Sequence, residues 1–351
     1  MKSKWFVILI ITLMILILAT IAVFVVKIIK GKKSMIVETI SVTTDNTKAE
    51  EKKVKIFSGD KRPLAVMIDN VKEAWPQSSI NDAYIVYEII VEGGETRLMA
   101  LFKNSEADVI GPIRSSRHYF LDYALENDAI YAHIGWSPQA QSDISTLGVN
   151  NINGLYYDSG NARTEDAKYW REKSKTAPHN CYSSISKLYE IAESLGYRTK
   201  SSNNSVLKYS INEIELENGK EAKKVTIPYS DNTTVKYEYS SETKRYTKFE
   251  KNTKQTDGKT GKDITTKNII ITFAGNYLLQ DKETKGRQGI KNIGTLNGYY
   301  ITNGKVIEIK CIKNARNSKT IYQDMEGNEI NVNDGNTFIQ ICPLNSKVVI
   351  E

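Results

Sequence analysis

The chain has 351 residues, a formal net charge of +7 and 40% hydrophobic residues. Residues 1–33 contain six lysines and no acidic residue, so the rest of the chain has a net charge of only about +1. Nucleic-acid binding requires a concentrated basic surface, and the nearly neutral composition of residues 34–351 argues against one. We therefore expect no nucleic acid among the partners.

Residues 5–26 carry no charge and are almost wholly apolar. As a helix they would extend about 33 Å, enough to cross a hydrocarbon core of about 30 Å. A cleavable signal peptide would have a shorter apolar region and a small-residue cleavage site. We predict that residues 1–33 form a retained membrane anchor and residues 34–57 a polar linker. Lysines are more numerous after the span than before it, which by itself favours a cytoplasmic C-terminal part.

About 290 residues remain, more than one ordinary hydrophobic core holds, so we predict two domains. Residues 58–200 alternate strand and helix signals, whereas residues 201–351 are dominated by strand signals separated by Gly, Asn and Asp turns. The predicted fold class is α+β: an N-terminal mixed α/β domain with a β-hairpin-centred sheet, followed by a smaller β-rich C-terminal domain.

In the N-terminal domain, the pattern predicts a strand at 64–68 that ends at Asp69, a hairpin at 82–102 and a strand at 129–136. Helices are expected at 116–126 with Ser115 as N-cap, from Pro138 to near Gly148, and at 184–195 before Gly196. The C-terminal strand candidates are 206–216, 224–227, 234–239, 268–273, 298–301, 306–312, 320–323 and 337–341. Residues 248–267 are rich in lysine and predict a solvated loop or hairpin tip.

The hairpin at 82–102 contains the Gly93–Gly94 pair between two β-rich apolar runs. A two-residue turn at these glycines would pair Glu92 with Glu95 and Ile90 with Arg97. Because side chains alternate across a strand, one face would then carry the polar set and the other an apolar set. The predicted polar face consists of Glu88, Ile90, Glu92, Glu95, Arg97 and Met99.

Crowded carboxylates on a partly buried sheet cannot all ionise at their ordinary pKa, so this face is a candidate catalytic site. Glu92 is the candidate acid/base and Glu88 its electrostatic partner. The alternative is an ordinary solvated face with weak ion pairs across the strands.

Arg114, Ser115 and Arg117 lie at the predicted start of a helix, where backbone donors and guanidinium groups could bind a carboxylate or phosphate. Alternatively, Arg114 pairs with a hairpin carboxylate and stabilises the fold. His133 on its strand and His179 with Asn180 on a loop each have a structural and a functional interpretation.

Cys181, Cys311 and Cys342 are an odd number without metal-type spacing, and we expect no metal site and no cofactor. Cys311 and Cys342 could pair if the domain is exported. The sequence contains no phosphate-binding glycine loop, nucleophile elbow or dinucleotide fingerprint.

Several ordered blocks resemble the YerB-like putative lipoproteins of Gram-positive bacteria. These blocks are RPLAVMIDN at 62–70, PQS at 76–78, VYE at 86–88, VEGG at 91–94, TR at 96–97, GPIRSSR at 111–117, APHN at 177–180, YITNGKVI at 300–307 and TFIQI at 337–341. The resemblance implies an exported, two-domain envelope protein, but the family carries no known reaction. This chain has a spanning helix in place of the lipidated cysteine.

The resemblance implies export, and we follow it in preference to the lysine count for the orientation of the chain. We therefore predict a single-pass membrane protein with extracytoplasmic domains that act on the cell wall. One hypothesis is an enzyme that cleaves peptidoglycan glycan strands in the manner of a lytic transglycosylase, with Glu92 and Glu88 as catalytic residues. The substrate-binding candidates are Asp69, Arg97, Arg114, Ser115, Arg117, His133, His179 and Asn180. The alternative is a non-catalytic module that binds wall polymer or cell-wall synthesis and division proteins.

Overall fold

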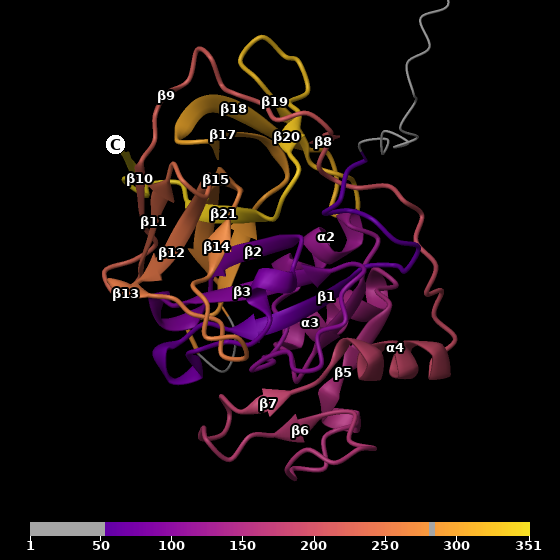
Figure 1. Ribbon diagram of the computed structural model, residues 1–351. Helices are drawn as coiled ribbons and strands as arrows, with labels where there is room; N and C mark the ends of the chain where they lie inside the picture. The colour runs from indigo at the N-terminus through magenta and orange to yellow at the C-terminus, as the bar shows by residue number, and fades with distance from the viewer. Residues whose placement is uncertain (1–52, 281–284) are drawn as a thin grey trace, which may run out of the picture. The chain divides into compact units, whose positions relative to one another are not determined.

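A long mixed β-sheet runs through both halves of the chain in the computed structural model, which describes residues 53–280 and 285–351 (Figure 1). The strand order along its main path is β19-β18-β17-β15-β21-β2-β3-β1-β4-β5. These strands are β1 (Leu64–Asp69), β2 (Ile85–Ile90), β3 (Thr96–Phe102), β4 (Ile130–His133), β5 (Asn151–Asn153), β15 (Asn268–Leu278), β17 (Gly294–Thr302), β18 (Lys305–Lys313), β19 (Ile321–Gln323) and β21 (Thr337–Pro343). Two short strands, β9 (Lys220–Glu221) and β16 (Gln288–Lys291), pair with β18 and β15.

Strand β21 joins the two halves of this sheet. It lies parallel to β15 on one side and parallel to β2 on the other, with Phe338 opposite both Ile269 and Val86. Strand β2 belongs to the N-terminal half, so the C-terminal half donates a central strand next to the hairpin. The two halves therefore share one hydrogen-bonded sheet.

A second sheet packs on one face of the long sheet. Its order is β13-β12-β11-β10-β22, with β14 beside β12. Val225 and Tyr237 of this sheet share a hydrophobic core with Val86 and Leu98 of the hairpin. The strands are β10 (Lys224–Pro228), β11 (Thr234–Ser240), β12 (Arg245–Glu250), β13 (Thr253–Lys254), β14 (Thr265–Thr266) and β22 (Val349–Ile350).

Helices cover both faces of the N-terminal half. Helices α2 (His118–Glu126) and α3 (Pro138–Thr146) pack on the face that carries Met67 and Tyr87, whereas α4 (Ile185–Ser194) packs on the opposite face. Figure 1 shows α4 beside β5 and the second sheet beside β2 and β3. The remaining short pairs are β6 (Trp170–Arg171) with β7 (Cys181–Tyr182) and β8 (Tyr209–Ser210) with β20 (Val332–Asn333).

The predicted fold class is confirmed, since a mixed α/β N-terminal half precedes a strand-rich C-terminal half. The strand that ends at Asp69 and the helices that begin after Ser137 and Ser184 are also confirmed. Both serine side chains accept a capping hydrogen bond from the helix backbone. The domain boundaries at 58, 200 and 201 stay predictions.

The predicted hairpin register is wrong by one residue. The turn contains three residues, Glu92–Gly94, so that Val91 hydrogen-bonds to Glu95 and Ile89 pairs with Arg97. Because side chains alternate along a strand, this shift moves Arg97 and Met99 to the face opposite Glu88. The expected single face with all the carboxylates and the guanidinium does not form.

Three further predictions are corrected. Ser115 is not the N-cap of α2; Arg117 holds that position, without a side-chain capping bond. Within 206–216 the described strand is only β8. Residues 248–267 are not a uniformly solvated loop, because β12 begins at Arg245 and its Lys248 is only 2% exposed.

The three cysteines are free and buried, so the possible Cys311–Cys342 pairing is not present. Strands β17 and β15 lie between β18, which carries Cys311, and β21, which carries Cys342. Neighbouring strands are about 4.8 Å apart, whereas bridged cysteines have Cα atoms within about 7 Å. The sheet therefore holds the two thiols too far apart to pair.

The predicted anchor at 1–33 and residues 34–52 of the predicted linker at 34–57 lie outside the described residues. Within 53–280 and 285–351, no helix is long and apolar enough to cross a membrane.

Candidate functional site

A cavity of about 550 Å³ lies where β1 and β2 end and β3 begins. Five of its side chains are cationic and three are acidic. It is lined by Asp69, Val71, Val91, Glu92, Glu95, Arg97, Arg114, Ser115, Arg117, Trp136, Lys285 and Arg287. We call it the arginine pocket.

Arg97 is a buried cation of the arginine pocket. It is 6% exposed, and its Nη1 donates to the backbone oxygen of Ser115 at 2.7 Å. Its Nε has no hydrogen-bond partner, and among the described residues no carboxylate lies within ion-pair distance of Arg97. Burial and the neighbouring charge of Arg117 lower the pKa of Arg97 to about 10, so the group stays protonated at neutral pH. The pocket therefore contains a buried positive charge that an anion could neutralise.

Glu92 and Arg117 form a two-point ion pair beside Arg97. Arg117 Nε lies 2.5 Å from Oε1 of Glu92, and Nη2 lies 3.0 Å from Oε2. Burial would raise the pKa of Glu92, but the hydrogen bonds and charge of Arg117 outweigh it and lower the pKa below its ordinary value. Glu92 is therefore a carboxylate at neutral pH and an unfavourable proton donor.

Asp69 is shared by an arginine and a histidine. Its Oδ2 atom lies 3.1 Å from Nε of Arg114 and 2.8 Å from Nδ1 of His179. The Asp69 side chain is 2% exposed, whereas those of Arg114 and His179 are 24% and 20% exposed. Arg114 thus pairs with a carboxylate of the fold, but that carboxylate is Asp69 and not a residue of the hairpin.

His179 lines a second cavity of about 920 Å³ and is linked to the arginine pocket by its contact with Asp69. The loop at 172–182 forms one wall and the loop at 73–78 another. Its lining residues are Glu73, Trp75, Pro76, Ser78, Val109, Glu172, Ser174, Lys175, Thr176, Ala177, His179, Tyr182, Gly258 and Lys259. We call it the His179 cavity.

Glu88 belongs to neither cavity. It is fully buried on the other face of the sheet, where Asn70, Thr96 and Gln340 donate hydrogen bonds to it. Lys248 Nζ lies 3.4 Å from Glu88 and 2.6 Å from Glu250. The second sheet thus supplies the cation that compensates this buried carboxylate.

Glu250 is fully buried with Lys248 and Glu88, so two carboxylates share one ammonium group. Burial and the charge of Glu88 raise the pKa of Glu250 to about 7, although Lys248 opposes the rise. The cluster joins the hairpin to β12 and contributes to the packing of the two sheets. It has no access to solvent and cannot contact a substrate.

Two predicted ligand-binding residues have structural partners. His133 is fully buried, and its ring nitrogens contact the Gly135 oxygen at 2.8 Å and the Asn151 side chain at 3.3 Å. Burial lowers the pKa of His133 to about 4, which keeps the ring neutral. Asn180 donates to the backbone oxygens of Glu172 and Lys175 and so holds their loop.

Of the predicted site residues, the arginine pocket brings together Asp69, Glu92, Arg97, Arg114, Ser115 and Arg117. Sequence reasoning missed Trp75 and Trp136, which line the two cavities, and the buried pair Lys248 and Glu250. The spacing Tyr246, Lys248, Glu250 was a usable signal, because alternate residues of a strand share the face of the buried tyrosine.

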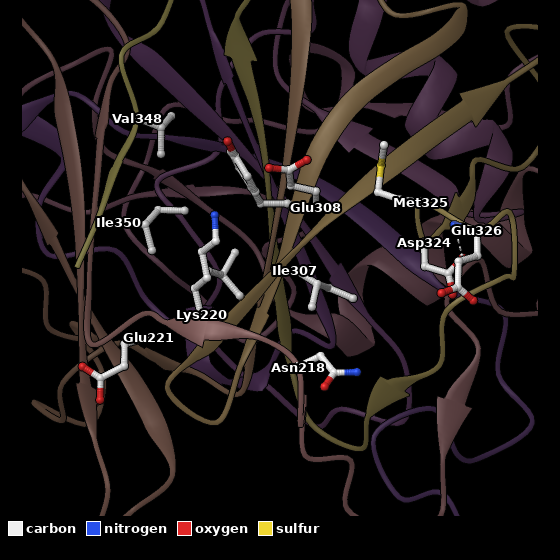
Figure 2. Close-up of a pocket in the computed structure, with 12 residues that line it drawn as sticks. Asn218, Lys220, Glu221, Ile307, Glu308, Asp324, Met325, Glu326, Val348 and Ile350 are labelled. Atoms are coloured by element: carbon white, nitrogen blue, oxygen red, sulfur yellow. Dashed lines mark hydrogen bonds between the residues drawn. The ribbon is translucent and has the colours of Figure 1, made fainter.

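A third cavity of about 770 Å³ lies between β9, β18 and β22. Figure 2 shows the Lys220, Val348 and Ile350 side chains on one side of Glu308, and Met325, Asp324 and Glu326 on the other. None of the predicted site residues lines this cavity. Its Asp324 carboxylate is occupied by backbone donors of its own turn.

In the described part of the chain, no group of three or more His, Cys, Asp and Glu residues is arranged to hold a metal ion. The arrangement in the arginine pocket instead favours binding of an anionic group by guanidinium groups.

Comparison with known proteins places these features in a family. The N-terminal domain described as "Protein of unknown function (DUF3048)" matches residues 47–198, and its C-terminal domain matches residues 225–339. The "Putative lipoprotein YerB" of Bacillus subtilis (strain 168) is 30% identical over 295 residues, covering 81% of this chain and 82% of that protein. The crystal structure of YerB protein from Bacillus subtilis superposes with a TM-score of 0.72 at 28% identity, covering 85% of this chain and 97% of that one. The chain therefore belongs to the YerB-like DUF3048 family.

Proposed function

We propose that this protein is an extracytoplasmic envelope protein, held at the membrane by residues 5–26, whose arginine pocket binds an anionic group of a cell-wall polymer. The observation that carries the proposal is Arg97, a buried guanidinium whose Nε donor is unused and which lines the arginine pocket. A carboxylate or phosphate there would supply the missing acceptor.

The envelope location is supported by the family relationship, since the Bacillus subtilis relative is described as a putative lipoprotein. The apolar length of residues 5–26 fits a membrane anchor. A domain tethered in this way reaches the wall polymers nearest the membrane, many of which carry carboxylate or phosphate groups.

A binding role fits the geometry better than cleavage of glycan strands. Glycosidic cleavage requires a carboxylic acid that is protonated near neutral pH. The ion pair with Arg117 lowers the pKa of Glu92, and Glu88 lies buried on the other face of the sheet. Neither carboxylate is suited to donate a proton to a substrate.

Sedimentation with purified cell walls tests the proposal. The full chain in detergent should pellet with walls at low salt and be released as the salt concentration rises, because the contact is between charges. R97Q should remain in the supernatant, whereas R198Q, which changes an exposed arginine outside the described cavities, should pellet like the wild type. Equal pelleting of all three proteins would contradict the proposal.

The same samples test the enzymatic alternative. Soluble muropeptides released from the walls would be measured by liquid chromatography after prolonged incubation. We expect none from the wild-type protein. Release by the wild type that is lost in E92Q would support a catalytic Glu92 instead of a binding pocket.

A further inference from the structure

The pair formed by Asp69 and His179 connects the arginine pocket to the His179 cavity. Asp69 lines the arginine pocket, and the same Oδ2 atom that contacts Arg114 also contacts Nδ1 of His179. One buried carboxylate oxygen therefore contacts a lining residue of each cavity, Arg114 of the arginine pocket and His179 of the other.

The hydrogen bond to Asp69 fixes which nitrogen of His179 is available to a ligand. Because a carboxylate accepts hydrogen bonds, Nδ1 of His179 is the donor in this contact, and in the neutral imidazole tautomer with this proton Nε2 is an acceptor. Among the described residues, no hydrogen-bond partner of Nε2 is present, and His179 lines the cavity. A ligand hydroxyl group could donate to this nitrogen.

The His179 cavity is also lined by an aromatic side chain, Trp75. Trp75 is half-buried, and its Nε1 donates to the backbone oxygen of Asn70 at 3.1 Å, which fixes the indole. Pro76, Ser174 and Thr176 also line the cavity. A fixed aromatic surface with a few polar groups suits a ligand that has an apolar face and hydroxyl groups at its edge.

The loop that carries His179 is held firmly in place. Lys175 Nζ donates to the backbone oxygens of Ala74 at 2.5 Å and Pro76 at 2.7 Å, so the 172–182 loop is tied to the loop of Trp75. Asn180 secures the same loop through the Glu172 and Lys175 oxygens. The two walls of the cavity are thus positioned relative to each other before any ligand binds, which reduces the entropic cost of binding.

We infer that the His179 cavity is a sugar-binding subsite, in which Trp75 contacts the sugar ring and His179 Nε2 accepts from a sugar hydroxyl. The inference rests on the proposed function, because it assigns the anionic group of the same ligand to the arginine pocket. The ligand class is then a sugar that carries an acidic substituent.

Calorimetric titration of the full chain in detergent tests this inference with three small probes. Sodium lactate supplies a carboxylate alone, methyl N-acetyl-β-glucosaminide supplies the neutral sugar, and N-acetylmuramic acid combines the two. We expect N-acetylmuramic acid to bind at least tenfold more tightly than lactate. Glycerol 3-phosphate carries hydroxyl groups and an anion but no sugar ring, so it serves as the polyol comparison. Its affinity should exceed that of inorganic phosphate by less than tenfold.

Substitutions test whether the tighter binding of N-acetylmuramic acid comes from the His179 cavity. W75L and H179Q should lose the tenfold advantage of N-acetylmuramic acid and keep the wild-type affinity for lactate. H118Q, a change in a histidine that lines none of the described cavities, should leave both affinities unchanged. Thermal unfolding of each variant confirms that the fold is retained.

The outcomes separate this inference from the proposed function. If lactate binds but N-acetylmuramic acid binds no more tightly, or W75L and H179Q keep the advantage, the sugar subsite is overturned and the anion pocket stands. If glycerol 3-phosphate shows the same gain, the sugar assignment is also overturned. If the neutral glycoside binds and depends on Trp75 while lactate and phosphate do not bind, the subsite stands and the proposed function fails.

Discussion

Arg97 Nη1 donates a 2.7 Å hydrogen bond to the backbone oxygen of Ser115, while the Nε of the same side chain has no acceptor. The bond fixes a buried guanidinium at the wall of a 550 Å³ cavity. A buried donor without a partner costs about 1–3 kcal/mol. Binding of an anion would recover that cost, which is why the arginine pocket is the centre of the proposed function.

Replacement of Glu92 distinguishes a binding pocket from a catalytic one. E92Q removes one negative charge beside Arg97 and releases Arg117 from its two-point ion pair. We expect phosphate to bind roughly three- to tenfold more tightly to E92Q than to the wild type. Repulsion between a phosphate in the pocket and the nearby Glu92 carboxylate opposes binding by about 1 kcal/mol, and the substitution removes it. Isothermal titration at constant ionic strength measures the change. Weaker binding of phosphate by E92Q would argue against the anion pocket.

Removal of the buried cation should destabilise the contact between the two sheets. K248M leaves Glu88 and Glu250 buried without a compensating charge, and breaking such a pair costs about 3–5 kcal/mol. The matched control is K254M, which removes an exposed lysine that pairs with Asp263. Urea unfolding followed by circular dichroism should show a large shift of the midpoint for K248M and almost none for K254M. Similar midpoints for both variants would mean that Lys248 and its two carboxylates contribute little to the stability of the fold.

The stability of the wild type should depend on pH through Glu250. Its pKa is raised to about 7 in the folded protein, above the ordinary value of 4.5. A raised pKa contributes stability that is fully present below the unfolded pKa and is lost as pH rises through the folded pKa. The free energy of unfolding of E250Q, relative to the wild type, should therefore rise between pH 5 and pH 8. A difference that stays constant over this range would exclude the raised pKa.

Alanine substitutions at the turn glycines Gly93 and Gly94 separate backbone strain from a steric clash of the added Cβ atom. Both have a positive φ, which costs a residue with a Cβ about 1–2 kcal/mol. A Cβ on Gly94 would lie 2.7 Å from Oγ of Ser230, whereas one on Gly93 meets nothing within 4 Å. Ser230 cannot easily move, because its hydroxyl donates to the Gly94 oxygen. We expect G94A to lower the unfolding midpoint more than G93A in the same urea experiment, and equal effects would contradict the close contact.

The sequence predicted most elements of the N-terminal half because their local signals agree with their tertiary surroundings. Ser137 caps its helix, the helix expected from about Ser184 begins at Ile185, and the strand before Asp69 is a continuous apolar run. The hairpin was located correctly, but its register depends on one extra turn residue. Two glycines favour a two-residue turn, whereas the structure places Glu92 in the turn as well.

The buried cluster could not be predicted from local pattern because its members come from distant segments. Glu88 and Lys248 are separated by 160 positions in the chain, and each looks like a surface residue in its own strand. The same holds for Asp69 and His179, which only the folded loops bring together. Arg97 was named from the predicted hairpin face, and Arg114 and Arg117 from the predicted helix start, but their common cavity depends on the corrected register.

The most direct test of the account is calorimetric titration of sodium phosphate and sodium acetate into the wild type, R97Q and R198Q. Loss of a charge-assisted hydrogen bond of about 1.5–3 kcal/mol should weaken binding of both anions to R97Q by roughly 10- to 100-fold. R198Q should bind like the wild type, because Arg198 pairs with Asp128 outside the pocket. Wild-type affinity in R97Q, with the fold intact by thermal unfolding, would contradict the account.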